Sequence, residues 1–301
     1  EDTDVARSSS EMVDGILEGM SWLGLSWDEG PYYQSQRSGL YRSAAEKLLE
    51  EGSAYRCFCQ ESAGEKDYQK TGTVDPCRNL PEGEVLESVE AGRESAVRFK
   101  VPENQQVAFE DGVFGTVKVE TENLPDFVIL RSDGTPTYHL SVVADDVDMQ
   151  ITHVIRGADH LSNTTKHVLL FQSLGATPPK FVHLPLILGP DKKRLSKRHG
   201  ATSVLEYQKQ GFIPQALRNY LALLGWSPGD DRQVRCVEPD DGEERPALPR
   251  GLLNERHRTI HDDAGIVTFQ VVGHQQAFVA SWIRACIRSW PGPVVRAVID
   301  R

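Results

Sequence analysis

Residues 151–188 read ITHVIRGADHLSNTTKHVLLFQSLGATPPKFVHLPLIL and carry the strongest fold signal in the chain. Apolar runs predict strands over 152–156 and 181–188, and the segment 162–174 between them has helical spacing. A strand–helix–strand unit of this length predicts parallel strands joined by a crossover helix, as in α/β proteins. Ligands of such sheets bind at the carboxyl ends of the strands. Because Arg156 ends the first strand and a loop follows the second, we expect both at one crevice.

The segments on either side extend this alternation of helices and strands. Helical spacing predicts helices over 36–51, 139–147, 203–210 and 213–224. Near the start, Ser8 and Glu11 have the spacing of a capping box, which predicts that a further helix begins there.

Residues 60–125 have a different texture, with short β-like runs broken by Gly, Pro and acidic residues. Strands are expected at 95–101, 106–109 and 116–119. The apolar run 127–130 follows, and the turn after it is typical of a hairpin. We interpret this region as an α+β module inserted between two parts of the α/β domain.

The end of the chain differs in composition from the rest. Residues 233–301 contain nine Arg and no Lys, whereas residues 1–231 contain 12 Arg and 11 Lys. Residues 240–249 are polar and contain Pro, so they are typical of a linker. The sequence predicts no coherent domain beyond it.

Bulk properties predict a soluble cytoplasmic protein of about two domains. The chain has 301 residues, of which 39% are hydrophobic and 26% charged, and no apolar stretch approaches the roughly 20 residues of a membrane span. Its net charge of −11 argues against a protein that coats nucleic acid non-specifically. Five cysteines, an odd number, do not suggest a disulfide framework.

A basic loop follows the second strand of the central unit. After Gly189-Pro190, five of the next eight residues are basic: Lys192, Lys193, Arg194, Lys197 and Arg198. Lys offers a point charge and Arg a planar fork to phosphate oxygens, and the Ser196 hydroxyl can donate to the same group. Taken as a charge run alone, the loop is more typical of a solvated surface than of a phosphate site.

Six motifs, occurring in one order along the chain, resemble those of a known family and favour the phosphate-binding interpretation of the loop. The chain resembles bacterial glutamyl-tRNA synthetases, which are class I aminoacyl-tRNA synthetases, from residue 1 to about residue 232. The motifs are Glu1-Asp2-Thr3-Asp4, Cys57-Phe58-Cys59, Asp126-Phe127-Val128-Ile129-Leu130-Arg131, Val154-Ile155-Arg156-Gly157, Leu195-Ser196-Lys197-Arg198-His199-Gly200 and Gln215-Ala216-Leu217-Arg218-Asn219-Tyr220-Leu221.

The resemblance implies an α/β fold with the Rossmann-like parallel sheet of class I synthetases. Residues 1–56 and 126–200 would form this catalytic domain, without its first strand. Residues 57–125 would form the inserted module that binds the tRNA acceptor stem. Residues 201–232 would be a helical segment contacting the stem, and residues 233–301 an atypical tail, either disordered or derived from a shifted reading frame.

The implied reaction is that of a glutamate–tRNA ligase, which activates L-glutamate with ATP and Mg²⁺ and transfers it from glutamyl-adenylate to tRNA(Glu). By resemblance, the residues that bind glutamate are Glu1, Tyr138 and Arg156. The ATP-binding residues are Asp159, with His160 beside it, and Arg194, Leu195, Ser196, Lys197 and Arg198. Lys197 is the expected catalytic residue, because a donor at the α-phosphate stabilises the transition state by on the order of 3 kcal/mol. Ala158 and Arg194 depart from the family, which commonly has Glu and Lys there.

A zinc site is a further implication of the resemblance. Cys57, Cys59 and Cys77 match three ligands of the zinc-binding insertion found in some bacterial members. A structural zinc needs four ligands. Thr73 stands where the family has its fourth, a Tyr, and Tyr68 has a different spacing. Ordinary buried thiols are the alternative.

The sequence also leaves other functions open. It contains no HIGH-type motif, so we expect an N-terminally truncated chain that shows no ATP–pyrophosphate exchange by itself. One alternative is a glutamyl-queuosine tRNA(Asp) synthetase, a shorter relative. Another is a catalytically inactive paralogue that binds ATP, glutamate or tRNA as a regulator. The family expectation for the oligomeric state is a monomer.

Overall fold

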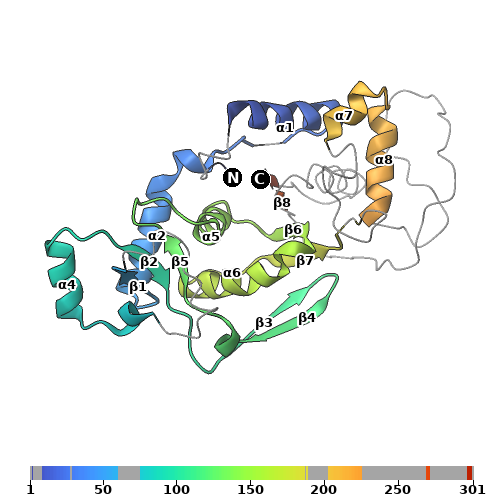
Figure 1. Ribbon diagram of the computed structural model, residues 1–301. Coiled ribbons are helices and arrows are strands. Elements are labelled where there is room, and N and C mark those ends of the chain that lie inside the picture. The colour runs from blue at the N-terminus through green and yellow to red at the C-terminus, as the bar shows by residue number, and fades with distance from the viewer. Residues whose placement is uncertain are drawn as a thin grey trace.

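The strand–helix–strand unit expected at the centre of the chain is present. The computed structural model describes residues 2, 9–27, 29–59, 75–186, 188, 203–225, 269–271 and 297–299 (Figure 1). In it, β6 (His153–Gly157) and β7 (Lys180–Leu184) pair in parallel and are joined by α6 (Leu161–Ser173). The mixed α/β architecture with parallel strands is therefore confirmed. The second strand is shorter than expected, ending at Leu184.

A hairpin extends the parallel pair into a four-stranded sheet of order β4-β3-β7-β6. β3 (Gln106–Asp111) pairs in parallel with β7 through Asp111 and Phe181, and β4 (Gly115–Glu120) pairs antiparallel with β3. Burial alternates along β3, whereas nearly every residue of β6 and β7 is buried. This contrast is expected, because parallel strands are usually covered on both faces.

A second sheet contains three antiparallel strands in the order β1-β2-β5. They are β1 (Ala54–Cys57), β2 (Ala96–Phe99) and β5 (Phe127–Leu130). Strand pairing thus crosses the domain boundaries expected at residues 57 and 125. β3, from residues 57–125, pairs with β7, and β5, which follows these residues, pairs with β2 from among them. The division into domains remains a prediction.

Helices cover the sheets and enclose the main core. α5 (Tyr138–Asp148) packs against α6 and against α2 (Ser38–Glu50), as Figure 1 shows. Apolar side chains from both sheets and from these helices, among them Phe99, Ile129, Leu140 and Leu170, are fully buried there. Burial of such a cluster supplies most of the stabilisation of a domain.

A smaller apolar core joins two segments that are distant in sequence. α1 (Ser10–Trp22) packs beside α7 (Val204–Lys209) and α8 (Pro214–Gly225). Arg218 of α8 donates a hydrogen bond of 3.1 Å to the Leu23 carbonyl oxygen. The expected capping box is wrong in its first residue. Ser9, not Ser8, caps α1 by accepting from the Met12 amide, because the helix begins at Ser10.

Several elements were not predicted. One is the helix α4 (Glu82–Glu90), which has no fully buried residue. Short 3-10 segments are η1 (Gln34–Gln36), η3 (Pro76–Asn79), η4 (Thr121–Asn123) and η5 (Ala158–His160). In the tail, β8 (Phe269–Val271) and β9 (Ala297–Ile299) pair in parallel, and β8 contacts β6. Among the helices of the described residues, none is long and apolar enough to cross a membrane.

Candidate functional site

Arg156 lies near the carboxyl end of β6 and is completely buried. It is the direct register partner of His183 on β7. Side chains of register partners project to the same face of a sheet, so the two groups lie side by side. The parallel pairing of two strands 27 residues apart thus creates the first contact of the site.

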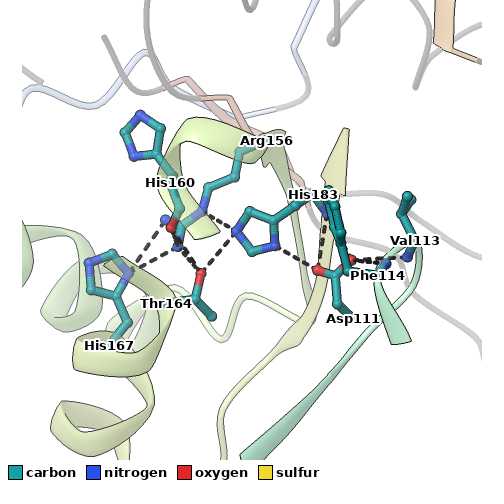
Figure 2. Close-up of polar contacts among 8 residues, drawn as sticks. All are labelled: Asp111, Val113, Phe114, Arg156, His160, Thr164, His167 and His183. Atoms are coloured by element: carbon teal, nitrogen blue, oxygen red, sulfur yellow. Dashed lines mark hydrogen bonds and ion pairs between the residues drawn. The ribbon is translucent and has the colours of Figure 1, made fainter. Parts of the chain in front are cut away.

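The guanidinium of Arg156 is bound by neutral groups on several elements (Figure 2). Its Nε donates to His183 Nε2 at 3.1 Å, and its Nη1 donates to the Tyr138 hydroxyl at 3.2 Å. Its Nη2 donates to Thr164 Oγ1 at 2.6 Å and to the His160 carbonyl oxygen at 3.4 Å. The site therefore combines β6, β7 and the N-terminal parts of α5 and α6.

His183 is oriented by a buried carboxylate at the end of β3. Its Nδ1 lies 2.6 Å from Asp111 Oδ2, and both side chains are fully buried. Figure 2 shows His183 between Asp111 on one side and Arg156 on the other. Because Nδ1–H donates to the carboxylate, Nε2 is left as the acceptor that faces Arg156.

Asp111 is itself held firmly in the turn after β3. Its Oδ1 accepts the amides of Val113 and Phe114, both at 2.9 Å. Burial favours the neutral acid, but the hydrogen bonds from His183 and from these two amides outweigh it. They hold the pKa of Asp111 below its usual value. The carboxylate is thus ionised at neutral pH and fixes the tautomer of His183.

Three imidazoles near Arg156, those of His139, His167 and His183, are neutral at pH 7. Burial lowers the pKa of His183, and burial followed by the charge of Arg156 lowers that of His167 well below its ordinary value. Burial also lowers the pKa of His139 to about 3, with Lys166 as the next cause. His139 Nδ1 lies 3.2 Å from His167 Nε2, so the imidazoles near Arg156 are in contact with one another and form a histidine shell. Arg156 is consequently the positive charge at its centre.

No carboxylate among the described residues forms a hydrogen bond with Arg156. Burial lowers the pKa of Arg156 overall, while Tyr138, Asp146 and Asp159 lie close enough to raise it electrostatically. Asp146 is buried, and burial raises its own pKa well above the usual value, although the charge of Arg156 lowers it. Arg156 is thus a desolvated cation surrounded by neutral acceptors, an arrangement that favours binding of an anion.

The structure brings together some of the residues predicted from the sequence. Tyr138 and Arg156 are in contact, and burial raises the pKa of Tyr138 to about 12, so its hydroxyl stays protonated. The Asp159 carboxylate lies 4.0 Å from His160 Nε2. The remaining predicted glutamate- and ATP-binding residues lie outside the described residues: Glu1, Arg194, Leu195, Ser196, Lys197 and Arg198.

Sequence reasoning missed Asp111, Thr164, His167 and His183. Each lies in a helix or at a strand end where its own neighbours give no chemical signal. For His183 a signal exists, because counting in parallel register from Arg156 leads to it. No comparable local signal identifies Asp111, which is 72 residues from His183 in sequence.

A separate cluster of thiols lies at the end of β1. Cys57, Cys59 and Cys77 come together, and the Sγ atoms of Cys59 and Cys77 are 3.6 Å apart. This separation excludes a disulfide, whose sulfurs are about 2.05 Å apart. It approaches the value of about 3.8 Å that tetrahedral geometry gives for two sulfurs bound to one zinc at 2.3 Å. The expected grouping of these cysteines fits a zinc ion.

Asp75 also lies in this cluster and was not predicted. One ligand atom from each of the three cysteines and Asp75 lies within 4.8 Å of the others. Burial raises the pKa of Cys57, and a hydrogen bond to Asp75 raises it further. Without a cation, this thiol is therefore protonated at neutral pH.

Comparison with known proteins places this chain in a family. The sequence model of class I tRNA synthetases (E and Q), catalytic domain, matches residues 1–239. Glutamate–tRNA ligase 2 of Koribacter versatilis is 57% identical over 235 residues, covering 75% of this chain and 49% of the relative. Glutamate–tRNA ligase 1 of Alkalilimnicola ehrlichii is 51% identical over 276 residues, covering 85% of this chain and 57% of the relative.

Solved structures show the same likeness. The crystal structure of a glutamate tRNA ligase from Elizabethkingia meningosepticum, in complex with its amino acid, matches with a TM-score of 0.67 and 34% identity. The match covers 77% of this chain and 54% of that one. The chain spans about half the length of the curated relatives that it matches. Because the family match covers most of its residues, the chain belongs to the class I tRNA synthetase (E and Q) catalytic-domain family.

Proposed function

We propose that this chain provides the glutamate-recognition and ATP-binding part of a glutamate–tRNA ligase. The observation that carries the proposal is the buried Arg156, which is hydrogen-bonded to neutral groups at the carboxyl end of a parallel strand. The names of its relatives, glutamate–tRNA ligases at 45–57% identity, agree with this assignment.

A dicarboxylic amino acid supplies the group that Arg156 lacks among the described residues. A guanidinium binds a carboxylate through two parallel N–H bonds, which also fix its orientation. The 3.4 Å contacts of Arg156 with His160 and His167 are long, so a carboxylate would compete well for these donors. The Tyr138 hydroxyl, which accepts a hydrogen bond from Arg156, would contact the same ligand.

The reaction follows the class I scheme. A glutamate carboxylate attacks the α-phosphate of ATP and releases pyrophosphate, and the terminal ribose of tRNA(Glu) then takes the glutamyl group and releases AMP. Mg²⁺ accompanies ATP. Lys197 and Arg194 in the basic loop would neutralise charge that develops on the phosphates. That loop follows β7 in the chain, which supports its assignment to the same edge of the sheet.

Direct binding tests the glutamate site without requiring the whole reaction. Calorimetric titration of the full chain with L-glutamate and L-glutamine is expected to show preference for L-glutamate. Arg156→Lys should weaken L-glutamate binding about 10- to 100-fold, because a charged hydrogen-bond pair is worth about 1.5–3 kcal/mol. Arg42→Lys, an exposed substitution on α2, is the control and should leave binding unchanged.

Two further results would count against the proposal. Equal affinity for both amino acids would remove the role of Arg156 as a carboxylate receptor. Charging of tRNA(Asp) in preference to tRNA(Glu) by a protein containing this sequence would assign it to the glutamyl-queuosine class.

A further inference from the structure

The thiol cluster contains three sulfur ligands, and a structural zinc requires four ligands. We propose that Asp75 is the fourth ligand of a zinc ion held by Cys57, Cys59 and Cys77. The family's usual oxygen donor at this site, a Tyr, is replaced by Thr73 in this chain. The inference goes beyond the ligase reaction, and its tests do not depend on glutamate, ATP or tRNA.

The first support is proximity. The carboxylate of Asp75 and the three sulfurs all lie within 4.8 Å of one another. Contraction by about 1 Å would bring the most distant pair to the separation expected around a tetrahedral zinc. The four residues come from two short segments, the end of β1 and the start of η3, so the ligands are fixed by compact local structure.

The second support is the way Asp75 is held. It is 4% exposed, its Oδ1 accepts the Cys77 amide at 2.8 Å, and its Oδ2 accepts the Tyr55 hydroxyl at 3.2 Å. Carboxylates that ligate metals are usually oriented by such hydrogen bonds. Each carboxylate oxygen has about two acceptor positions, so Oδ1 retains one after binding the Cys77 amide.

The third support is the charge around the cluster. Three thiolates and one carboxylate carry four negative charges, and a zinc ion cancels two of them. Arg98 is 4% exposed, and its Nε lies 3.2 Å from Asp75 Oδ2. Its positive charge offsets part of the negative charge that remains after zinc binding. Such compensation is required because buried charges are costly unless they are paired. Arg98 therefore supports the zinc site through its ion pair with the carboxylate ligand Asp75.

Metal content and coordination of the full chain provide the first test. One zinc per chain is expected by plasma mass spectrometry. X-ray absorption should show three sulfurs at about 2.3 Å and one light ligand at about 2.0–2.2 Å. A chain that takes up no stoichiometric zinc after incubation and gel filtration would overturn the proposal.

Substitutions identify the light ligand. Asp75→Asn should raise the zinc dissociation constant at least about 100-fold, more than the loss of a residue that only supports a ligand. Asp126→Asn is the matched control, because Asp126 also accepts the Tyr55 hydroxyl, at 3.0 Å, but is outside the thiol cluster. Tyr68→Phe should leave affinity unchanged. The proposal is wrong if Tyr68→Phe weakens zinc binding and Asp75→Asn does not.

Replacing Asp75 with a sulfur ligand gives a spectroscopic result that loss of folding could not produce. Asp75→Cys should convert the site to four sulfur ligands, visible both by X-ray absorption and as stronger thiolate-to-cobalt absorption after cobalt substitution. A spectrum that keeps three sulfurs in this variant would show that residue 75 does not reach the metal.

Discussion

Asp111 and His183 are 72 residues apart in sequence, yet the carboxylate oxygen of one lies 2.6 Å from the Nδ1 atom of the other. The contact fixes the imidazole tautomer and directs the Nε2 lone pair at Arg156, 3.1 Å away. The position of a family-motif residue thus depends on a carboxylate supplied by the neighbouring hairpin. This relationship makes Asp111 a positioning residue for Arg156.

Asp111→Asn should therefore destabilise the protein and disturb Arg156. An amide has one acceptor oxygen, which cannot replace both carboxylate oxygens toward His183 and the turn amides. We expect a loss of about 2–3 kcal/mol in the free energy of unfolding, the usual range for hydrogen bonds to charged groups. Urea unfolding measures it. Glu110→Gln, an exposed neighbour on β3, is the control and should change stability by less than about 0.5 kcal/mol.

A second buried carboxylate joins α5 to α2. Asp145 accepts Gln34 Nε2 at 2.8 Å, Arg37 Nε at 2.7 Å and the Tyr41 hydroxyl at 3.0 Å. Asp145→Asn should cost about 3 kcal/mol in thermal or urea unfolding, because it removes the buried carboxylate partner of the partly buried Arg37 guanidinium. Asp148→Asn removes an exposed ion pair of the same Arg37 and should cost less than about 1 kcal/mol. Equal losses of stability in the two variants would contradict the expectation that the buried ion pair contributes more stability than the exposed one.

The neutral histidine shell should make stability depend on pH in the mildly acidic range. The folded-state pKa of His139 is about 3 and its unfolded value is about 6.5, so the unfolded chain binds more protons between these values. Stability therefore falls as pH falls through this window, by about 1.4 kcal/mol per pH unit for this residue. From pH 7 to pH 5 the expected loss is about 2 kcal/mol from His139 alone.

His167 and His183 add to this loss, since burial lowers the pKa of both. Urea unfolding at pH 7, 6 and 5 measures the dependence, and His139→Gln should reduce its slope by about 1.4 kcal/mol per unit. An unchanged slope in this variant would mean that His139 is protonated in the folded protein.

Gly157 allows Asp159 to fold back over the end of β6. A Cβ atom at position 157 would lie 2.5 Å from Asp159 Oδ1, so the side chain of Asp159 must move in Gly157→Ala. Because the obstructing atom is the end of a flexible side chain, the stability loss should be small, about 1 kcal/mol or less. ATP affinity of the full chain, measured by equilibrium dialysis, should fall if Asp159 contacts ATP. Unchanged affinity would remove Asp159 from the nucleotide site.

Local sequence patterns determined much of the secondary structure. The apolar runs that became β5, β6 and β7 and the helical spacing of α2, α5 and α6 were readable because each depends on periodicity within one segment. The parallel pairing of β6 and β7 followed from the crossover between them. Motif order was sufficient to indicate the family, and it singled out Tyr138, Arg156 and the three cysteines.

Local patterns failed where the decision depends on long-range pairing. The pairing of β3 with β7 could not be predicted, because an alternating strand can join either sheet with the same local sequence. That single register choice places Asp111 beside His183. The helix α4 was also missed; it has no fully buried side chain, and Val85 packs partly buried against the cluster that contains Cys57 and Cys77.

The sequence alone thus determined many of the strands and helices, that two strands run parallel, and which residues resemble a glutamate and ATP site. Only the tertiary structure decided that Arg156 is a buried cation among neutral imidazoles, that Asp111 orients it through His183, and that Asp75 joins the thiols. The physical reason is that periodicity is a property of consecutive residues. Burial, pKa shifts and ligand clusters arise from groups far apart in sequence, which only folding brings within a few ångströms.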